Sequence, residues 1–423
     1  MPNTFSKEER VAFENILEGF QDALVLSRNV SVYNTDSTSM ERSRDTIWRP
    51  MPYIATSFNS TVGSSISSNY EDMTQLSVPA TLGFSKTSAW KLDAKELRDA
   101  LQENRLGQAA RQKLASDINV SVMNVAANQG TLVVPVAGAS GDYDDIALCD
   151  SLMNEQGIPM ENRYLALNSR DYNGLAGNLA ATTRSFGNSK SDKAYERSYV
   201  GMVAGFETYK LDYGNRIAAQ ATAVTIATNG AQVRFVPRAT TNSVGGQINV
   251  DNRYQTVTVS TTVGVNVGDA FTIPGINARH HITKLSTGQP KTFRVISVDS
   301  GTTMTISPPM IGANSSPTDA EQQYQNIEVV STSAAATLNW LNDNATVMNC
   351  FWHKDSIELM PGRYAVPTDA GTAVIRASTD QGIELVMQKF YDIDTMTTKY
   401  RLDTLYGVTM SNPQMAGILL FNQ

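Results

Sequence analysis

Apolar residues recur at every fourth position in the middle of the stretch Leu92–Gly130, at Leu106, Ala110, Leu114, Ile118, Val122 and Ala126. The stretch contains no proline, its only internal glycine is Gly107, and residues that favour helices dominate it. A spacing of four residues overshoots the 3.6-residue turn by about 40°, so the stripe drifts around the axis and its two ends should contact different neighbours. The pattern predicts a long helix that stops at Gly130.

A second helix is predicted from Ser6 to Arg28. Ser6 and Glu9 form an S-x-x-E capping box at its start. One face is apolar and consists of Phe13, Ile16, Leu17, Phe20 and Leu24. The remaining surface is acidic and includes Glu14 and Glu18. Such a surface is more often simply solvated, and the alternative is that it contacts a basic partner.

The segment Pro52–Ser85 is unusually polar. Ser, Thr and Asn dominate it, and Glu71 and Asp72 are its only charged residues. A segment this polar has little core of its own, so we expect a long extended hairpin that lies on something else. In a monomeric enzyme it would be a lid, and in an assembly it would lie on a neighbouring subunit.

A short basic cluster precedes this segment. Three arginines surround Trp48, and two carboxylates interleave with them, at Arg42, Arg44, Arg49, Glu41 and Asp45. Arginines beside an aromatic ring could contact nucleic acid, but the carboxylates reduce the local charge. A structural ion-pair cluster is therefore the favoured interpretation.

Helical periodicity stops at Thr222, and the run Leu338–Trp340 is predicted to be helical again. Between these points, eight short runs such as TVTVS and TFRVISV alternate apolar and polar residues, with turn signals between them. They predict a small all-β barrel or sandwich inserted into another domain. Three strand-like runs between Thr372 and Leu420 predict a meander of long antiparallel strands.

Composition narrows the functional classes. The chain has 423 residues, which predicts two or three domains. Its net charge of −7 argues against a general grip on nucleic acid. Two cysteines in unrelated contexts, Cys149 and Cys350, fit a reducing cytoplasm better than a disulfide framework. The polar N-terminus predicts no secretory signal, and no apolar run approaches the length of a membrane span.

Motifs for chemistry are scarce. His280, His281 and His353 are the only histidines, and they lack further ligands at matching spacing for a metal site. The chain has no P-loop, no dinucleotide fingerprint and no G-x-S-x-G elbow. We therefore expect no catalytic residues, no metal and no cofactor. A Ser/His/Asp triad stays open at this point, since it needs no fixed spacing.

Four stretches carry a family resemblance. They are SMERSRDTIWRP (39–50), the stretch Leu92–Gly130, VDNRYQTVTVSTTVGVNVGDAFTIPGI (250–276) and NCFWHKDSI (349–357). In collinear order over nearly the whole chain, they resemble the major coat proteins of short-tailed lambdoid phages of Salmonella and Shigella. The length and low cysteine count suit the Shigella phage member.

The resemblance implies an α+β fold, the Johnson (Hong Kong-97 type) capsid fold. The long helix would be its spine helix, and the polar segment its extended loop. The implied division is an N-terminal arm at 1–35, a peripheral domain at 36–51, 86–135 and 371–423, an extended loop at 52–85, an axial domain at 136–221 and 339–370, and an inserted β-barrel domain at 222–338.

The resemblance also implies a function. The chain would self-assemble with a scaffolding protein into hexamers and pentamers of an icosahedral shell, in the host cytoplasm. The virion shell would include a portal protein and enclose double-stranded DNA without sequence-specific binding, and no membrane would be involved. The alternatives from the residues alone are a hydrolase-like enzyme with a β accessory domain and a monomeric binding module.

Candidate contacts follow from the same resemblance. The acidic helix surface, at Glu14 and Glu18, would meet the scaffolding protein. Contacts between subunits would involve Arg42, Trp48, Glu71, Asp72, Arg238 and Arg253. For Arg253 the alternative is that Asp251 simply neutralises it within one chain. In the family, the loop before the VDNR run carries charges that bridge neighbouring capsomers, but Arg238–Asn249 contains no carboxylate. The electrostatic form of that bridge is therefore in doubt, and hydrogen bonds or nothing would replace it.

Overall fold

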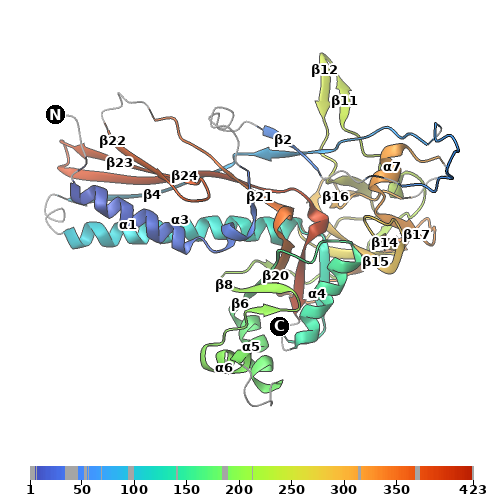
Figure 1. Cartoon of the computed structure of the whole chain (residues 1–423), viewed down its shortest axis with the longest axis horizontal. Coiled ribbons are helices and arrows are strands. Elements are labelled where there is room, and N and C mark those ends of the chain that lie inside the picture. The colour runs from blue at the N-terminus through green and yellow to red at the C-terminus, as the bar shows by residue number, and fades with distance from the viewer. Residues whose placement is uncertain are drawn as a thin grey trace. The chain divides into compact units, whose positions relative to one another are not determined.

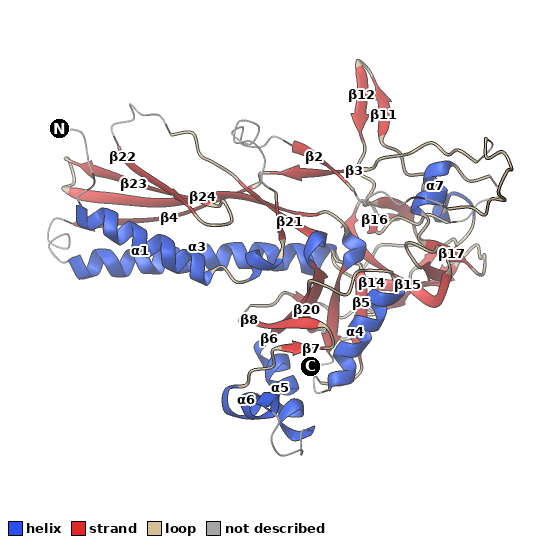
Figure 2. Ribbon diagram, viewed as in Figure 1, coloured by secondary structure: helices blue, strands red, loops and turns tan. Residues whose placement is uncertain are grey.

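The computed structural model describes residues 5, 7–33, 46–51, 55, 57–67, 69–93, 100–139, 142–182, 189–211, 213–312, 316–366 and 372–421. The chain divides into two compact units. Unit 1 comprises Met1–Ile47, Ala80–Met123 and Ile357–Thr409, and unit 2 comprises Trp48–Pro79, Asn124–Ser356 and Met410–Gln423. Both contain helices and sheets (Figure 2), which confirms the α+β class.

Unit 1 is built from two helices on a six-stranded sheet. Helices α1 (Lys7–Ala23) and α3 (Ala100–Gln129) lie side by side (Figure 1). The sheet runs in the order β1 (Ser31–Val32), β21 (Ile357–Pro361), β24 (Thr397–Met410), β23 (Glu384–Asp392) and β22 (Ala373–Ser378), and β4 (Phe84–Asp93) also pairs with β24. The long C-terminal strands confirm the predicted antiparallel meander.

The helix α1 packs its apolar face inward. Phe13, Ile16 and Phe20 are buried, and the Arg111 guanidinium of α3 donates to the Asn15 carbonyl oxygen at 2.9 Å. The helix ends at Ala23, and a 3-10 helix follows at Leu26–Asn29, so the predicted helix was too long at its C-terminal end. The expected capping residue, Ser6, lies outside the described residues.

The long helix is confirmed, but it starts later than its composition suggested. Leu92 and Asp93 belong to β4, which pairs with β24 from Phe84↔Tyr406 to Asp93↔Thr397. Cross-strand pairing over this whole length outweighs the local helix propensity of the last two residues. At the other end, the Gly130 amide donates to the Ala126 carbonyl oxygen at 3.0 Å, and strand β5 (Leu132–Val136) begins two residues later.

The drifting stripe of α3 behaves as expected. Ala110, Leu114, Ile118, Val122 and Ala126 are all buried, and Leu106 is half-buried. In the part within unit 1, the Ser121 hydroxyl bonds the Tyr406 hydroxyl of β24 at 2.8 Å. In the part within unit 2, backbone carbonyls of the last turn accept from Arg294. The two ends of the helix therefore contact different elements.

Unit 2 contains a seven-stranded mixed sheet. Its order is β5, β25 (Ala416–Phe421), β20 (Thr346–His353), β6 (Arg163–Asn168), β8 (Phe206–Leu211) and β7 (Met202–Val203), and β9 (Arg216–Ile217) also pairs with β20. Helices α4 (Tyr143–Glu155), α5 (Ser169–Thr182) and α6 (Ser189–Arg197) accompany it. Leu165, Phe206 and Phe351 are fully buried in its core.

The predicted all-β region forms a second sheet in unit 2. Its order is β13 (Gln255–Thr258), β16 (Thr303–Ser307), β15 (Ser286–Val298), β14 (Ala270–Arg279) and β17 (Ile327–Val329). Smaller pairs join β10 (Thr225–Ile226) to β18 (Ala336–Thr337) and β11 (Thr240–Ser243) to β12 (Gly246–Asn249). Phe271, Phe293 and Val295 lie at the centre of a separate apolar core.

The expectation that helix resumes at Leu338 was wrong. Asn339–Trp340 forms strand β19, which pairs with β14. The Trp340 ring packs edge-on against Phe271 at 5.5 Å between ring centroids, and its Nε1–H donates to the Thr222 carbonyl oxygen at 2.7 Å. These contacts join the two ends of the β region, which a local helix could not do.

Candidate assembly surfaces

The hairpin β11–β12 extends from the rest of the β region in unit 2 (Figure 1). Its register runs from Thr240↔Asn249 to Ser243↔Gly246, which leaves Val244 and Gly245 as a two-residue turn. Gly245 and Gly246 adopt φ of +98° and +154°, which side-chain-bearing residues avoid. The sequence V-G-G therefore determines where the hairpin reverses.

This hairpin has no core of its own. All its residues from Thr241 to Asn249 are exposed, with Val244 at 110% and Ile248 at 53% exposure. A two-stranded hairpin alone is at best marginally stable in water. Its surface offers backbone groups, amides, hydroxyls and two apolar side chains, but no charge. This surface suits a partner that brings hydrogen-bonding and apolar groups.

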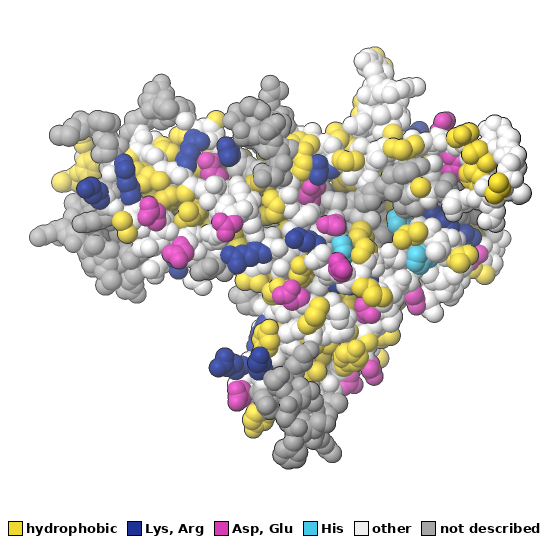
Figure 3. Space-filling model, in the orientation of Figure 1, with side chains coloured by type: hydrophobic (Ala, Val, Ile, Leu, Met, Phe, Trp, Pro, Cys, Tyr) yellow, Lys and Arg dark blue, Asp and Glu magenta, His cyan; other side chains and the backbone are white. Residues whose placement is uncertain are grey.

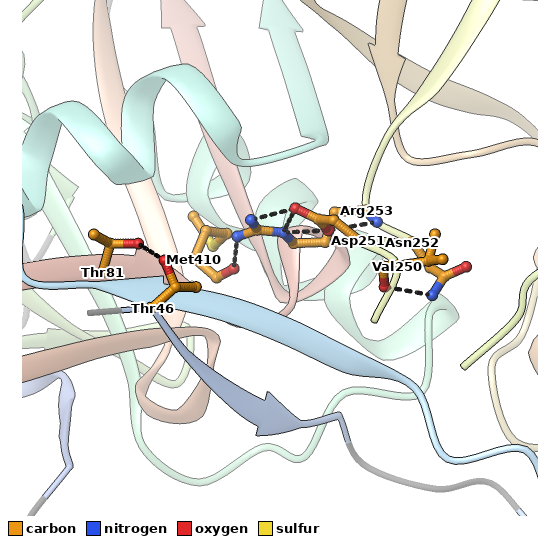
Figure 4. A network of polar contacts seen from close by, with 7 residues as sticks. All are labelled: Thr46, Thr81, Val250, Asp251, Asn252, Arg253 and Met410. Atoms are coloured by element: carbon orange, nitrogen blue, oxygen red, sulfur yellow. Dashed lines mark hydrogen bonds and ion pairs between the residues drawn. The ribbon is translucent and has the colours of Figure 1, made fainter. Parts of the chain in front are cut away.

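The two arginines at the hairpin's base differ in availability. Arg238 is exposed, and Asn252 holds its backbone by bonds of 3.1 and 2.9 Å. Arg253 is buried, pairs with the Asp251 carboxylate at 2.6 Å and donates to the Met410 carbonyl oxygen at 2.8 Å (Figure 4). Arg253 is therefore committed to partners within its own chain, whereas Arg238 is accessible.

The polar segment contains an exposed arm that carries apolar side chains. We use the name arm for the described residues between Pro50 and Ser77. Strand β2 (Thr46–Pro50), which carries half-buried Trp48, pairs with β3 (Ser77–Thr81), and the residues between them that the structure describes form no helix or strand. Five large apolar side chains of this arm are exposed, Phe58, Val62, Ile66, Tyr70 and Met73. Glu71 and Asp72 are exposed as well. Figure 3 shows hydrophobic and acidic side chains among uncharged atoms at the end of unit 2 where this arm passes.

The acidic surface of α1 is exposed as predicted from the sequence. Glu14 and Glu18 are exposed on the side opposite Phe13 and Phe20. Glu9 is different, because it pairs with Lys389 and accepts from the Tyr400 hydroxyl at 3.2 Å. Glu14 also lines a hollow of about 610 Å³ beside Arg10, Phe5 and strand β22. Arg42 lies outside the described residues.

Two buried cations were missed by the sequence reasoning. The Arg294 guanidinium is fully buried and donates to the carbonyl oxygens of Ala127 at 2.8 Å, Gly130 at 3.2 Å and Gly268 at 2.9 Å. It thus caps the C-terminal end of the long helix, where the helix dipole favours a cation. Burial lowers the pKa of Arg294 to about 10.

Lys291, three residues earlier on β15, is also buried. Its amine donates to the side-chain oxygens of Gln156 at 3.1 Å and Gln414 at 2.7 Å. Burial, and then the nearby charge of Lys284, lowers the pKa of Lys291 to about 7. The sequence offered no signal for either cation, because a charged residue within an alternating strand usually faces solvent.

No grouping of side chains in the described residues suggests metal chemistry. Groups of three or more His, Cys, Asp or Glu side chains that could hold an ion are absent from that part of the chain. Burial lowers the pKa of His281 to about 3, so its imidazole is neutral at ordinary pH. Both cysteines are free and buried. Within the same residues, no helix combines the length and apolarity needed to cross a bilayer.

Several known proteins are similar to this chain. Residues 1–422 match the family model described as P22 coat protein, gene protein 5. A Mycobacterium phage Che8 structure is similar with 9% identity, 93% of this chain and 90% of that chain covered, and a TM-score of 0.45. The capsid structure of cyanophage P-SCSP1u is similar with 10% identity, 94% of this chain and 88% of that chain covered, and a TM-score of 0.46. The CUS-3 coat protein I-domain is 36% identical, with 29% of this chain and 99% of that chain covered and a TM-score of 0.21.

Proposed function

The chain belongs to the P22 coat protein family, and from that membership we propose how its surfaces build a capsid. It is a major capsid protein, a structural protein of the bacteriophage virion and not an enzyme. Its α+β architecture is the Johnson capsid fold with an inserted β domain. The observation that carries this conclusion is the family match over residues 1–422.

The shell that we propose is icosahedral, made of hexamers and pentamers, and assembled in the host cytoplasm around a scaffolding protein. A portal protein and double-stranded DNA complete it. The chain's net charge of −7 supports a shell that holds DNA without gripping it. Within the family, the length of 423 residues and the two cysteines favour a relationship to the Shigella phage member.

Two surfaces would contact neighbouring copies. The first is the exposed arm with Phe58, Val62 and Tyr70, because apolar side chains exposed to water are unfavourable in a monomer and are typical of an interaction surface. The second is the hairpin β11–β12 with Arg238 at its base. Since the hairpin carries no charge, its contact would rest on hydrogen bonds and on the apolar side chain of Val244. Arg238, at the base of the hairpin, would add one positive charge to this contact. Trp48, Glu71 and Asp72 remain contact candidates, whereas Arg253 serves its own chain.

The test is co-expression of the chain with its scaffolding protein, followed by sedimentation and negative-stain imaging. We expect closed particles of megadalton mass. A matched variant lacks residues 57–70. This deletion leaves in place the following residues, 72–76, which pack on the inserted domain and which we call the root of the arm. This variant should remain a folded, soluble monomer. Particles of normal size from the deletion would contradict the role of the arm, and the absence of particles from the intact chain would contradict the proposed function.

A further inference from the structure

The root of the exposed arm is bound by a short helix of the inserted β domain. Helix α7 (Asp319–Tyr324) contacts the backbone of residues 72–74 through three side chains. The Asp319 carboxylate accepts from the Asp72 amide at 2.8 Å. The Gln323 side-chain amide donates to the Asp72 carbonyl oxygen at 3.0 Å and accepts from the Thr74 amide at 3.5 Å. The Tyr324 hydroxyl donates to the Thr74 carbonyl oxygen at 2.9 Å.

We propose that α7 is a clamp that fixes the root of the arm, so that the arm is presented in a defined position to a second copy of the chain. The proposal deepens the assembly function above and rests on it. It assigns to the inserted domain the positioning of another segment of its own chain. The clamp residues are Asp319, Gln323 and Tyr324, and their role is positional because they hold backbone groups of the arm.

The clamp recognises the arm's backbone together with one apolar anchor. Leu76 is buried against Ile311 and Tyr324, with half-buried Met51 and Phe235 packed around them. The two ends of the arm are also joined directly, because the Met51 amide donates to the Leu76 carbonyl oxygen at 2.8 Å. The Gln75 side chain donates to the Met51 carbonyl oxygen at 2.6 Å. The root is thus closed by hydrogen bonds and a small core.

Helix α7 is itself held in place by a capping box and an ion pair. A helix of this length would not form alone in water, but Thr318 and Glu321 form a capping box at its start. Glu321 is 1% exposed and pairs with Arg234 at 2.8 Å. Asp319 and Gln323 are four residues apart, so they share one helical face and both reach the arm. Glu321, between them, anchors the helix to the β domain.

The consequence concerns the cost of ordering the arm. The part of the arm that precedes Asp72, residues 57–71, is exposed and has no regular structure in its described residues, so docking on a second copy must restrict it. A fixed root shortens the part that must be ordered, which strengthens binding without adding any contact at the interface. Four exposed apolar side chains, those of Phe58, Val62, Ile66 and Tyr70, are then presented on a partly restrained segment.

The experiment compares neighbouring glutamines on α7. Gln323 is buried against the arm, whereas Gln322 is exposed on the same helix. Gln323→Ala and Gln322→Ala therefore make the same chemical change at adjacent positions of the same helix. Asp319→Ala is a second test variant, because it removes the other contact to Asp72 and leaves the Thr318 cap in place. Melting temperatures of the full chain control for folding.

Two measurements separate the clamp from the assembly function. In the unassembled chain, amide hydrogen exchange should accelerate about fivefold at Asp72 in Asp319→Ala and at Thr74 in Gln323→Ala, as expected for a lost side-chain hydrogen bond. Neither rate should change in Gln322→Ala. The initial rate of scaffold-assisted assembly should fall in the test variants only. Unchanged exchange would overturn the clamp whatever the assembly result.

Accelerated exchange with an assembly rate equal to that of Gln322→Ala would overturn the positioning role and leave the capsid function intact. If neither the intact chain nor Gln322→Ala assembled, the proposed function would fail, and the exchange data would still decide whether α7 binds the arm.

Discussion

At the scale of single residues, the most informative side chains are the two buried cations of β15. Arg294 and Lys291 lie in a strand whose residues from Lys291 to Val295 are all buried. Both cations are satisfied by neutral oxygens: backbone carbonyls surround Arg294, and two glutamine amides bind Lys291. Because burial disfavours the charged form of a cation and lowers the pKa of both side chains, each should make folding stability depend on pH.

Lys291 gives a prediction with a definite sign. Its pKa is about 7 in the folded chain, against an ordinary value of 10.5. Between these values the unfolded chain binds a proton that the folded chain does not, so folding stability should rise as pH increases from about 7 toward 10. One proton corresponds to a slope of at most about 1.4 kcal/mol per pH unit.

Lys291→Met should remove this contribution. Urea unfolding of the unassembled chain at pH 7 and pH 9.5 should show a smaller gain in stability for the variant than for the natural chain. Lys284, whose pKa is lowered to about 8, titrates in the same window in both proteins, so the comparison measures the contribution of Lys291 together with its repulsion of Lys284. Equal gains in the two proteins would show that the Lys291 amine stays charged when folded.

At the scale of elements, local patterns predicted the type of most segments and misplaced some of their ends. The four-residue apolar stripe identified α3, but the start of the predicted element belongs to β4, whose partner β24 lies more than 300 residues later. Leu338–Trp340 was similarly misassigned, because its pairing with β14 depends on a distant segment. The ends of these elements were decided by pairing with strands that are distant in sequence, so the neighbouring residues could not predict them.

The acidic surface of α1 should contribute to scaffold binding. Glu14 and Glu18 are exposed, so any attraction to a basic scaffold segment is screened by salt and cumulative. The double variant Glu14→Lys, Glu18→Lys should lower scaffold incorporation at low ionic strength, with a smaller effect at high ionic strength. Glu196→Lys, at an exposed position on α6, is the control for each of the single variants Glu14→Lys and Glu18→Lys. Unchanged incorporation at low salt would mean that the surface is only solvated.

The hairpin β11–β12 should act through apolar and hydrogen-bonding contacts. Val244→Ser should slow assembly or weaken the particles without lowering the melting temperature, because Val244 is exposed within its own chain. Its effect should depend little on salt, since the hairpin is uncharged. Val263→Ser, 75% exposed in the same β region, is the control. Equal assembly of both variants would remove Val244 from the contact.

Arg238 is tested separately from the hairpin tip. Arg238→Ala should alter assembly and leave melting unchanged, because its guanidinium is exposed and Asn252 bonds only its backbone. A lower melting temperature with normal assembly would instead make Arg238 a structural residue of the β domain.

At the scale of the whole molecule, the chain forms two units that are each discontinuous in sequence. Within unit 2, the β domain has its own apolar core around Phe271, Phe293 and Val295. That core supports the hypothesis that the domain folds alone as a fragment. The fragment's natural boundary is later than the Leu338 chosen from the sequence, because β19 pairs with β14 and Trp340 bonds Thr222.

A fragment of residues 222–343 should therefore be more stable than one of residues 222–338. The loss of the Trp340 packing and its hydrogen bond should lower the melting temperature of the shorter fragment by on the order of 5 °C. Both should give dispersed amide NMR spectra. Equal melting temperatures would show that β19 adds nothing to the isolated domain, and collapsed spectra from both would contradict independent folding.

The sequence by itself determined the features that depend on near neighbours. The apolar spacing of α3, the alternation of the β strands and the acidic surface of α1 could all be predicted from the sequence, because helix and strand periodicity is set within a few residues. The absence of carboxylates from the hairpin was readable in the same way, and so was the family resemblance.

Only the tertiary structure decided which of these features meet. It placed Arg294 against the end of the long helix, Asp251 and a distant carbonyl oxygen around Arg253, and α7 on the root of the arm. Each of these contacts, apart from the local Asp251–Arg253 pair, joins residues more than 100 positions apart. Desolvation and hydrogen-bond geometry act on neighbours in space, so a charge that the sequence shows as a surface group becomes a buried anchor only when the chain is folded.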